Sequence, residues 1–435
     1  MRHFLIKCRV MSTKTFFRGT VPAIILIGST VTAFASGFGL YEASSKTYAM
    51  GGAVLGKAVD ASANFHNPAT LTDLTNLTIT VGCMTEHPRA RIKVDGASSE
   101  SMNPGVFCLP SFQAAVPLPW DFVFGLGVMP EYGLGSAYDD NWSMNYNSTE
   151  TTVTSFTVNP NLAWKIGDFS VGAGLRFIFF DFEQYQYPFA GDGVTGTRYG
   201  RMNSRLKGDN RMEDFGYQIG MKYDVTDNFS VGLVYKSKTL LRIRGKSEVS
   251  YRESYAGAVG DYVVGKNVEK VDGPANTELE LPDSITGGFN WDFAEDWHLG
   301  GMVGWTQWST VKTLDFNLNG YHKPIKLEWN DTWRVGIAPS WDFADRWTAI
   351  MSYVYENDCC GDQESTMLPA ADRHMLSWGL CWSPYDWMEL ALTYGMIIMD
   401  GKETHCRETV SDELHTYRAY RGISHAAGLT LTFRF

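Results

Sequence analysis

Residues 291–297 read WDFAEDW and residues 341–347 read WDFADRW, so nearly identical stretches recur fifty positions apart. Aromatic residues accompany a short polar turn in both, and looser copies of this motif lie at 117–121, 164–169, 223–229 and 382–387. Tryptophan and tyrosine concentrate at the interface between lipid and water in membrane proteins. We therefore interpret the six copies as short periplasmic turns of a transmembrane β-barrel, with their aromatic side chains in one interfacial girdle.

The segments between these turns alternate with a period of two. In residues 388–396 (MELALTYGM), the even-numbered positions are large and apolar, whereas the odd-numbered positions are small or polar. The same alternation occurs at 169–177, 229–236 and 297–305. It is typical of β-strands that turn one face to apolar surroundings. A soluble sandwich would alternate too, but aromatic strand ends and lengths of about nine to twelve residues favour a membrane barrel.

The turns also give the number of strands. Six turns join twelve strands, and further strands are predicted at 77–93 and 420–435, which makes fourteen. An even number, with both chain ends on the periplasmic side, is usual for bacterial barrels. The predicted fold class is thus all-β, a transmembrane antiparallel β-barrel of about fourteen strands over residues 77–435. The other connections are longer and are predicted to be extracellular loops, at 131–150, 181–210, 244–276, 310–323, 358–371 and 400–419.

The composition agrees with a barrel and excludes other classes. Only 20% of the 435 residues are charged, whereas the chain has 43 glycines, 14 tryptophans, 21 tyrosines and 25 phenylalanines. After residue 35 no apolar run reaches the roughly 18 residues of a membrane helix, which excludes a helical membrane protein. The net charge of −11, with no basic stripe, argues against nucleic acid as a partner.

Residues 1–35 are predicted to be a secretory signal peptide. They contain five basic residues and no acidic one, and their apolar part ends in Ala-Phe-Ala at 33–35. This pattern predicts cleavage before Ser36, after translation from Met1 or Met11, and it favours a signal peptide over a membrane anchor. Export together with a barrel fold predicts the outer membrane of a Gram-negative bacterium as the location.

Six cysteines follow the signal peptide: Cys83, Cys108, Cys359, Cys360, Cys381 and Cys406. The oxidising exterior allows disulfides, and Cys359-Cys360 could pair with Cys406 if their loops meet, although free thiols fit as well. No metal-ligand spacing appears, and the scattered histidines form no constellation with a serine nucleophile. We therefore predict no catalytic residue, no metal, no cofactor and no enzyme activity.

Residues 36–76 precede the first strand and do not alternate. This segment could hang in the periplasm or fold into the lumen as a plug, where a barrel of fourteen strands, wider than its own side chains fill, would bury its apolar residues. It resembles the N-terminal hatch of the FadL-type outer-membrane transporters of long-chain fatty acids and other hydrophobic compounds. The matching stretches are Gly37–Glu42, Gly51–Ala53, Asp60–Ser62 and Asn67–Ala69 in the segment, and Trp305–Ser309, Trp333–Gly336 and Pro369–Arg373 downstream.

The resemblance implies passive uptake of long-chain fatty acids or hydrocarbons across the outer membrane, by lumen binding, plug movement and lateral release into the membrane. The family's exit is a gap made by a kink in the third strand, here expected at 121–129. Gly125 and Gly127 permit such a kink, and Pro130 ends the strand, although ordinary lumen-facing glycines are the alternative reading. A general diffusion porin and, less favoured, an outer-membrane lipid hydrolase are the competing functions.

The resemblance also assigns site residues within the plug. Phe38 and Leu40 are expected to take part in ligand contact or gating. Asn67, Pro68 and Ala69 are expected to control plug movement, with Asn67 hydrogen-bonded to the barrel wall, although a helix-capping or turn element is the alternative reading.

Strand parity adds candidate cations for a ligand carboxylate. Arg176, Lys222 and Lys236 fall on lumen-facing positions, where each could pair with an anion. Gly52 stands where the family often has a basic residue, which leaves ligand contact at that position in doubt. The expected partners are a hydrophobic small molecule, outer-membrane lipid and the assembly machinery, which would recognise the C-terminal Phe435. A monomer is expected.

Overall fold

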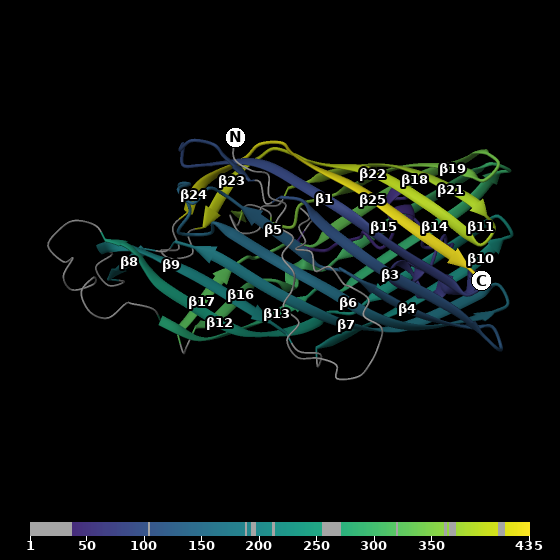
Figure 1. The fold of residues 1–435 in the computed structure, drawn as a ribbon, viewed down its shortest axis with the longest axis horizontal. Helices are drawn as coiled ribbons and strands as arrows, with labels where there is room; N and C mark the ends of the chain where they lie inside the picture. The colour runs from purple at the N-terminus through teal and green to yellow at the C-terminus, as the bar shows by residue number, and fades with distance from the viewer. Residues whose placement is uncertain are drawn as a thin grey trace.

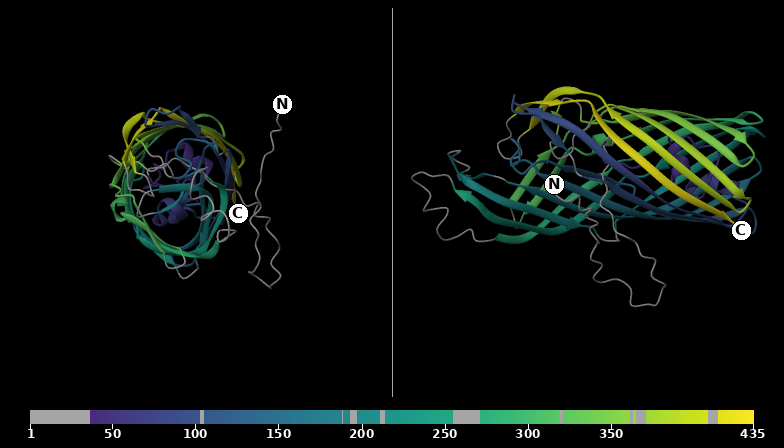
Figure 2. Two further views of the ribbon diagram at one scale, coloured as in Figure 1. Left: turned by 90° about the vertical axis from the view of Figure 1, so that its left-hand side faces the viewer. Right: turned by 45° about the horizontal axis from the view of Figure 1, so that its top comes forward.

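The computed structural model describes residues 37–435 apart from 103–104, 188, 193–196, 211–213, 255–270, 319–320, 361–362, 365–370 and 408–413. The predicted signal peptide lies outside the described residues. The chain forms one sheet, antiparallel throughout its ring of long strands, that closes on itself into a barrel with the N-terminal segment inside (Figures 1 and 2).

Fourteen strands form the ring, in agreement with the count from the sequence. In pairing order they are β1 (Thr78–Val94), β3 (Phe107–Leu118), β4 (Phe122–Met129), β6 (Glu150–Ile166), β7 (Phe169–Gln186), β10 (Phe215–Thr226), β11 (Phe229–Lys236), β14 (Ser284–Ala294), β15 (Trp297–Thr306), β18 (Thr332–Ala344), β19 (Trp347–Glu356), β21 (Arg373–Tyr385), β22 (Met388–Met399) and β25 (Gly422–Arg434). Each strand pairs antiparallel with the next, and β25 pairs with β1 to close the ring.

All six predicted turns connect neighbouring strands at the same end of the ring, which we call the periplasmic end. Their aromatic side chains lie on the outside and pair from one turn to the next. The Trp297 and Trp341 rings stack with centroids 5.3 Å apart, and those of Trp347 and Trp382 stack at 5.6 Å. These contacts agree with an interfacial girdle.

Other strands extend the wall at the opposite end: β5 (Gly133–Ala137), β9 (Thr197–Asp209), β12 (Thr239–Ser254), β13 (Val271–Leu281), β16 (Thr313–Leu318) and β17 (Tyr321–Lys326). Short pieces are β2 (Glu100–Met102), β8 (Phe189–Asp192), β20 (Gln363–Glu364), β23 (Lys402–Arg407) and β24 (Leu414–Ala419). The loops predicted at 181–210 and 244–276 are therefore largely strand in the described part, which corrects the prediction. Main-chain hydrogen bonds between neighbouring strands hold these extensions. Buried apolar residues alternate in several of them, such as Leu241 and Ile243 in β12 and Leu314 and Phe316 in β16.

Residues 37–77 run through the lumen and end at β1; from here on they are called the plug. They contain α1 (Ser45–Ala49), α2 (Ala63–His66) and the 3₁₀ helix η1 (Pro68–Asp73). Figure 2 shows the purple plug enclosed by the ring and nearer its periplasmic end. None of the described helices is long and apolar enough to cross a membrane.

A belt of inward-facing glycines makes room for the plug. A Cβ atom at any of these wall positions would lie within 3.1 Å of a plug atom. They are Gly125, Gly172, Gly220, Gly232, Gly288, Gly300, Gly379, Gly395 and Gly428. Their partners lie along the plug from Ser45 to Ala69, so wall and plug are in close contact over most of the plug's length.

The cysteines adopt one pairing that the sequence did not single out. Cys83 in β1 and Cys108 in β3 form a disulfide. No disulfide joins Cys406 to Cys359 or Cys360, all three of which are described and buried, so the pairing left open by the sequence does not occur.

Candidate functional site

The wall is interrupted where β4 ends. Up to Met129, β4 pairs with both β3 and β6, whereas β5 pairs with β6 and, among the described residues, has no partner strand on its β3 side. Between the two strands the chain turns to the plug instead. Leu40 N donates to Glu131 O and Gly133 N donates to Phe38 O, both at 2.8 Å. We call residues 130–132 the wall break.

Gly125 and Gly127 themselves form no bulge, which favours the alternative reading that they are lumen-facing glycines. Pairing on both sides of β4 runs through these glycines without a register shift. A Cβ at 125 would lie 2.0 Å from Asn64 Oδ1, so Gly125 accommodates the plug. The ladder stops at Pro130, where the strand was expected to end, because proline has no N–H to donate to a neighbouring strand.

A buried ion cluster lies beside the wall break. The guanidinium of Arg176 donates to both carboxylate oxygens of Glu131, at 2.8 and 3.3 Å, and the Lys236 ammonium lies 3.2 Å from the same carboxylate. Thr157 Oγ1 and Tyr132 Oη complete the hydrogen bonds. Because two cations face one anion, the Glu131 cluster (Glu131, Arg176 and Lys236) carries a net positive charge.

This cluster borders a cavity of about 80 Å³, which we call the polar cavity. Its lining includes Leu40 and His66 from the plug and Lys236, Trp308 and Arg334 from the wall. Three of these residues have a buried nitrogen with no hydrogen-bond partner in the described part of the chain. The three atoms are His66 Nε2, Trp308 Nε1 and Arg334 Nε.

The electrostatics of the polar cavity keep His66 neutral. Burial, together with the positive charges of Lys236 and Arg334, lowers the pKa of the His66 imidazole to about 3. Arg334 packs 3.8 Å from the Tyr41 ring centroid and donates to Gly51 O at 3.1 Å. Arg334 Nη1 would lie 3.4 Å from a Cβ atom at Gly52. A cation from the wall therefore lies beside the plug position where the family often has a basic residue.

A second cavity of about 30 Å³ is lined almost entirely by apolar side chains, and we call it the apolar cavity. Phe38 lies between the two cavities. Its ring contacts Trp308 and Tyr132, which line the polar cavity, at centroid distances of 5.0 and 5.8 Å. It also contacts Phe180 of the apolar cavity at 6.1 Å.

The three predicted lumen cations have different surroundings. Arg176 is buried in its ion pair, and only Lys236 lines the polar cavity. Lys222 is distant from it and forms ion pairs with Asp73 of η1 and, at 2.9 Å, with Asp224. The sequence analysis missed Arg334, although it has lumen-facing parity in the Trp333–Gly336 stretch that carries the resemblance.

The Asn67-Pro68-Ala69 stretch joins α2 to η1 and contacts the wall. Asn67 Nδ2 donates to Leu55 O at 2.7 Å and to Met221 O of β10 at 3.0 Å, so the expected hydrogen bond to the wall is present. Its Oδ1 accepts from Ala69 N at 3.1 Å and caps η1, whose first residue is Pro68. A part in gating stays a prediction for all three residues.

We expect Asn67→Ala to loosen the plug. It removes the amide that bonds the Leu55 and Met221 carbonyl oxygens and the Ala69 N–H. A polar group left buried without a partner costs about 1–3 kcal/mol. Hydrogen exchange of residues 55–72 should become at least tenfold faster. Asn76→Ala, at an exposed asparagine near the end of the plug, is the matched control, and equal exchange in both variants would contradict the assignment.

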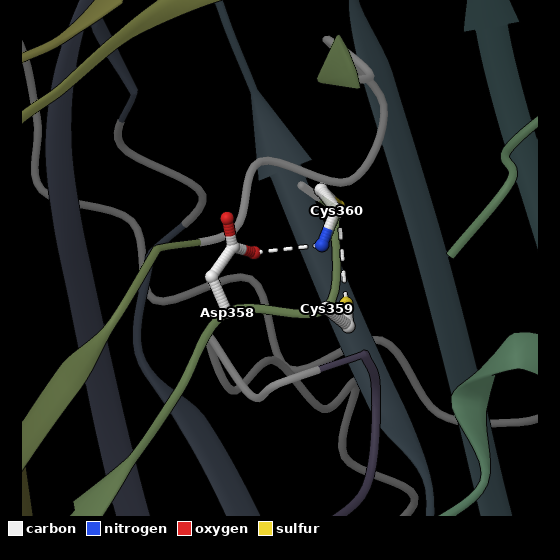
Figure 3. A group of neighbouring side chains, drawn as sticks. All are labelled: Asp358, Cys359 and Cys360. Atoms are coloured by element: carbon white, nitrogen blue, oxygen red, sulfur yellow. Dashed lines mark hydrogen bonds between the residues drawn. The ribbon is translucent and has the colours of Figure 1, made fainter. Parts of the chain in front are cut away.

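The plug begins against a loop with two adjacent cysteines. Gly37 N donates to Cys359 Sγ at 3.0 Å, and Cys360 Sγ lies 3.8 Å from that sulfur (Figure 3). The neighbouring Asp358 accepts hydrogen bonds at both carboxylate oxygens. Oδ1 accepts from Cys360 N at 2.8 Å, and Oδ2 accepts from the Lys402 ammonium. The group therefore anchors the first described residue of the plug through the Cys359 sulfur.

Comparisons with known proteins agree with this architecture. A family described as "Outer membrane protein transport protein (OMPP1/FadL/TodX)" matches residues 26–435. A "Long-chain fatty acid transport protein" of Escherichia coli O6:H1 is 23% identical over 406 residues, which is 86% of this chain and 89% of the relative. "Outer membrane protein P1" of Haemophilus influenzae is 22% identical over 377 residues, with 79% and 78% covered.

Solved structures share the fold. A FadL homologue from Pseudomonas aeruginosa superposes with a TM-score of 0.80 at 18% identity, covering 92% of this chain and all of the other. The toluene transporter TodX of Pseudomonas putida superposes with a TM-score of 0.71 at 16% identity, covering 92% and 99%. At these identities the likeness concerns the fold.

Proposed function

The chain belongs to the OMPP1/FadL/TodX family of outer membrane transport proteins, and we propose that it takes up hydrophobic molecules across the outer membrane without an energy source. Its relatives are outer-membrane proteins, and the family is one of transporters and channels, not enzymes. The relatives named above include a fatty-acid transporter and a toluene transporter, so the ligand class has to be argued from the cavities.

The single observation that carries the ligand class is the set of unpartnered donors in a positively charged polar cavity. The Glu131 cluster has one cation in excess. On the other side of the cavity, Arg334 and Arg373 both face Glu356, at 3.8 and 2.6 Å. Buried donors without acceptors are costly, and a carboxylate would satisfy several of them. The proposed ligand is therefore a long-chain carboxylic acid.

The apolar cavity suits the alkyl chain of such a ligand. Phe38 divides it from the polar cavity, so a turn of this side chain would join the two spaces. The wall break borders the polar cavity through Glu131 and Tyr132 and offers a sideways route into the membrane. A lateral exit avoids exposing the alkyl chain to water, which costs about 0.8 kcal/mol for each CH₂ group.

Passage requires the plug to move, and the contacts of Asn67, Pro68 and Ala69 support a gating role for that stretch. A general porin is disfavoured because the plug fills the lumen, and a hydrolase because the family is one of transporters. We further propose that the protein acts as a monomer. The exposed Phe435 at the end of β25 is the proposed signal for the assembly machinery.

Binding of oleate and of an uncharged alkene of equal length tests the ligand class. We expect Lys236→Met and Arg334→Met each to weaken oleate binding by ten- to a hundredfold, because each removes one charge-assisted hydrogen bond. Binding of the uncharged alkene should stay the same in both variants. Lys238→Met, at an exposed lysine two residues on, is the control. Equal effects on both ligands would contradict a carboxylate site, and unchanged cellular uptake of oleate and toluene after gene deletion would overturn the transport function.

A further inference from the structure

The repeated turn motif places two aspartates on either side of one histidine at the periplasmic end. His298 Nδ1 lies 2.7 Å from Asp292 Oδ1, and His298 Nε2 lies 3.1 Å from Asp342 Oδ2. With both ring nitrogens at carboxylates, the imidazole forms both hydrogen bonds when it is protonated, because a neutral ring has only one N–H.

The motif itself explains this arrangement. In both the 291–297 and the 341–347 copies of the motif, the aspartate that follows the first tryptophan forms a hydrogen bond with the residue that follows the last tryptophan. In one copy this pair is Asp292 and His298, and in the other it is Asp342 and Thr348, whose hydroxyl donates at 2.5 Å. The histidine stands where the second copy has a threonine, and it links the two hairpins into one chain of hydrogen bonds.

The plug is attached to the same chain. Lys57 Nζ lies 2.5 Å from Asp292 Oδ2, the carboxylate oxygen that His298 does not use. Next to it, Gly56 N donates to Asn290 Oδ1 at 2.9 Å. Lys57 is half exposed and His298 is about one-third exposed, so protons from the periplasm have access to this contact.

We propose that His298 is a pH-sensitive positioning residue of the plug, because it and Lys57 share the carboxylate of Asp292. When His298 is protonated, its charge repels the Lys57 ammonium through the shared carboxylate. When His298 is neutral, this repulsion is absent, while its one N–H still donates to Asp292 or Asp342. The coupling is reciprocal. If the Lys57 charge makes protonation of His298 less favourable, protonation of His298 weakens the contact between Lys57 and Asp292 by the same free energy. The charged groups that face His298 are Asp292 from β14, Asp342 from β18 and, beyond Asp292, Lys57 from the plug.

Acidification therefore loosens the 54–59 segment of the plug. The inference rests on the proposed function only because plug movement is the step that would let a ligand pass. Its test needs no ligand and no uptake, so failure of transport and failure of this proposal are separate results.

The test is hydrogen exchange of residues 54–59 in the full chain in lipid nanodiscs, at pH 8 and pH 6, corrected for the intrinsic exchange rate. We expect protection in the unmodified protein to fall about fivefold on acidification, the lower end of usual coupling between two sites. His298→Gln should show the same protection at both pH values. Lys57→Met should show low protection at both, because the contact with Asp292 is gone.

Two other histidines serve as controls. His425→Gln removes an exposed histidine that bonds Tyr394 on the outer wall, and His66→Gln removes the buried one in the plug. Both should keep the pH effect at 54–59. Protection that is independent of pH in the unmodified protein, that rises on acidification, or that still falls fully in His298→Gln would overturn the proposal. If His298→Gln does not fold, a full pH effect in Lys57→Met overturns it equally.

Discussion

Gly232→Val is expected to prevent the plug from seating in the barrel. A Cβ at this position of β11 would lie 1.7 Å from Leu55 O and 2.4 Å from Leu55 C, which are backbone atoms of the plug and cannot move aside as a side chain does. Across the neighbouring strand, Gly288 approaches Leu55 as well, so the plug has no free space into which to retreat there. Overpacking of this kind costs several kcal/mol at a rigid contact.

The effect should appear as loss of plug protection and as a leak. Residues 53–72 are expected to become open to protease from the periplasmic end, and cells should become sensitive to a bulky hydrophilic antibiotic. Gly287→Val is the matched control, because a Cβ there points outward and meets its nearest atom, Leu233 Cδ1, at an ordinary 3.5 Å. If both variants keep a protected plug, the glycine belt does not set the fit between plug and wall.

The sequence predicted the barrel well because its determinants are local. The turn motif gave six hairpins and a period of two gave the inner and outer faces, so the strand count followed before any long-range contact was known. Extensions such as β9 and the outer part of β12 were missed because those stretches are mostly polar, although β12 begins with alternating buried residues such as Leu241 and Ile243.

The candidate site was predicted only in part, for a physical reason. Strand parity shows that Arg176, Lys222 and Lys236 face the lumen, but it does not give their depth or their partners across the barrel. Arg334 has the same parity and was overlooked. The wall break could not be located either, because it depends on main-chain hydrogen bonds between residues about ninety positions apart in sequence, such as Leu40 and Glu131.

Among the lumen cations, Arg176→Met should destabilise the barrel most, by about 3–5 kcal/mol, the usual cost of removing one partner of a buried ion pair. Arg176 and Glu131 are 2% and 5% exposed in their side chains, and Arg176 makes the only bidentate contact to this carboxylate among the described residues. Lys236→Met leaves that contact in place, so its effect on stability should be much smaller. The denaturant midpoint of the barrel in lipid vesicles measures both.

A double variant separates the charge from the packing. If the loss in Arg176→Met comes from an uncompensated buried carboxylate, Glu131→Gln in the same chain should recover most of it, because the two effects are not additive for residues in contact. Arg176→Lys should recover little, since an ammonium cannot span both oxygens. A small loss in Arg176→Met together with a large loss of oleate binding would reverse the assignment and make Arg176, rather than Lys236, the ligand's cation.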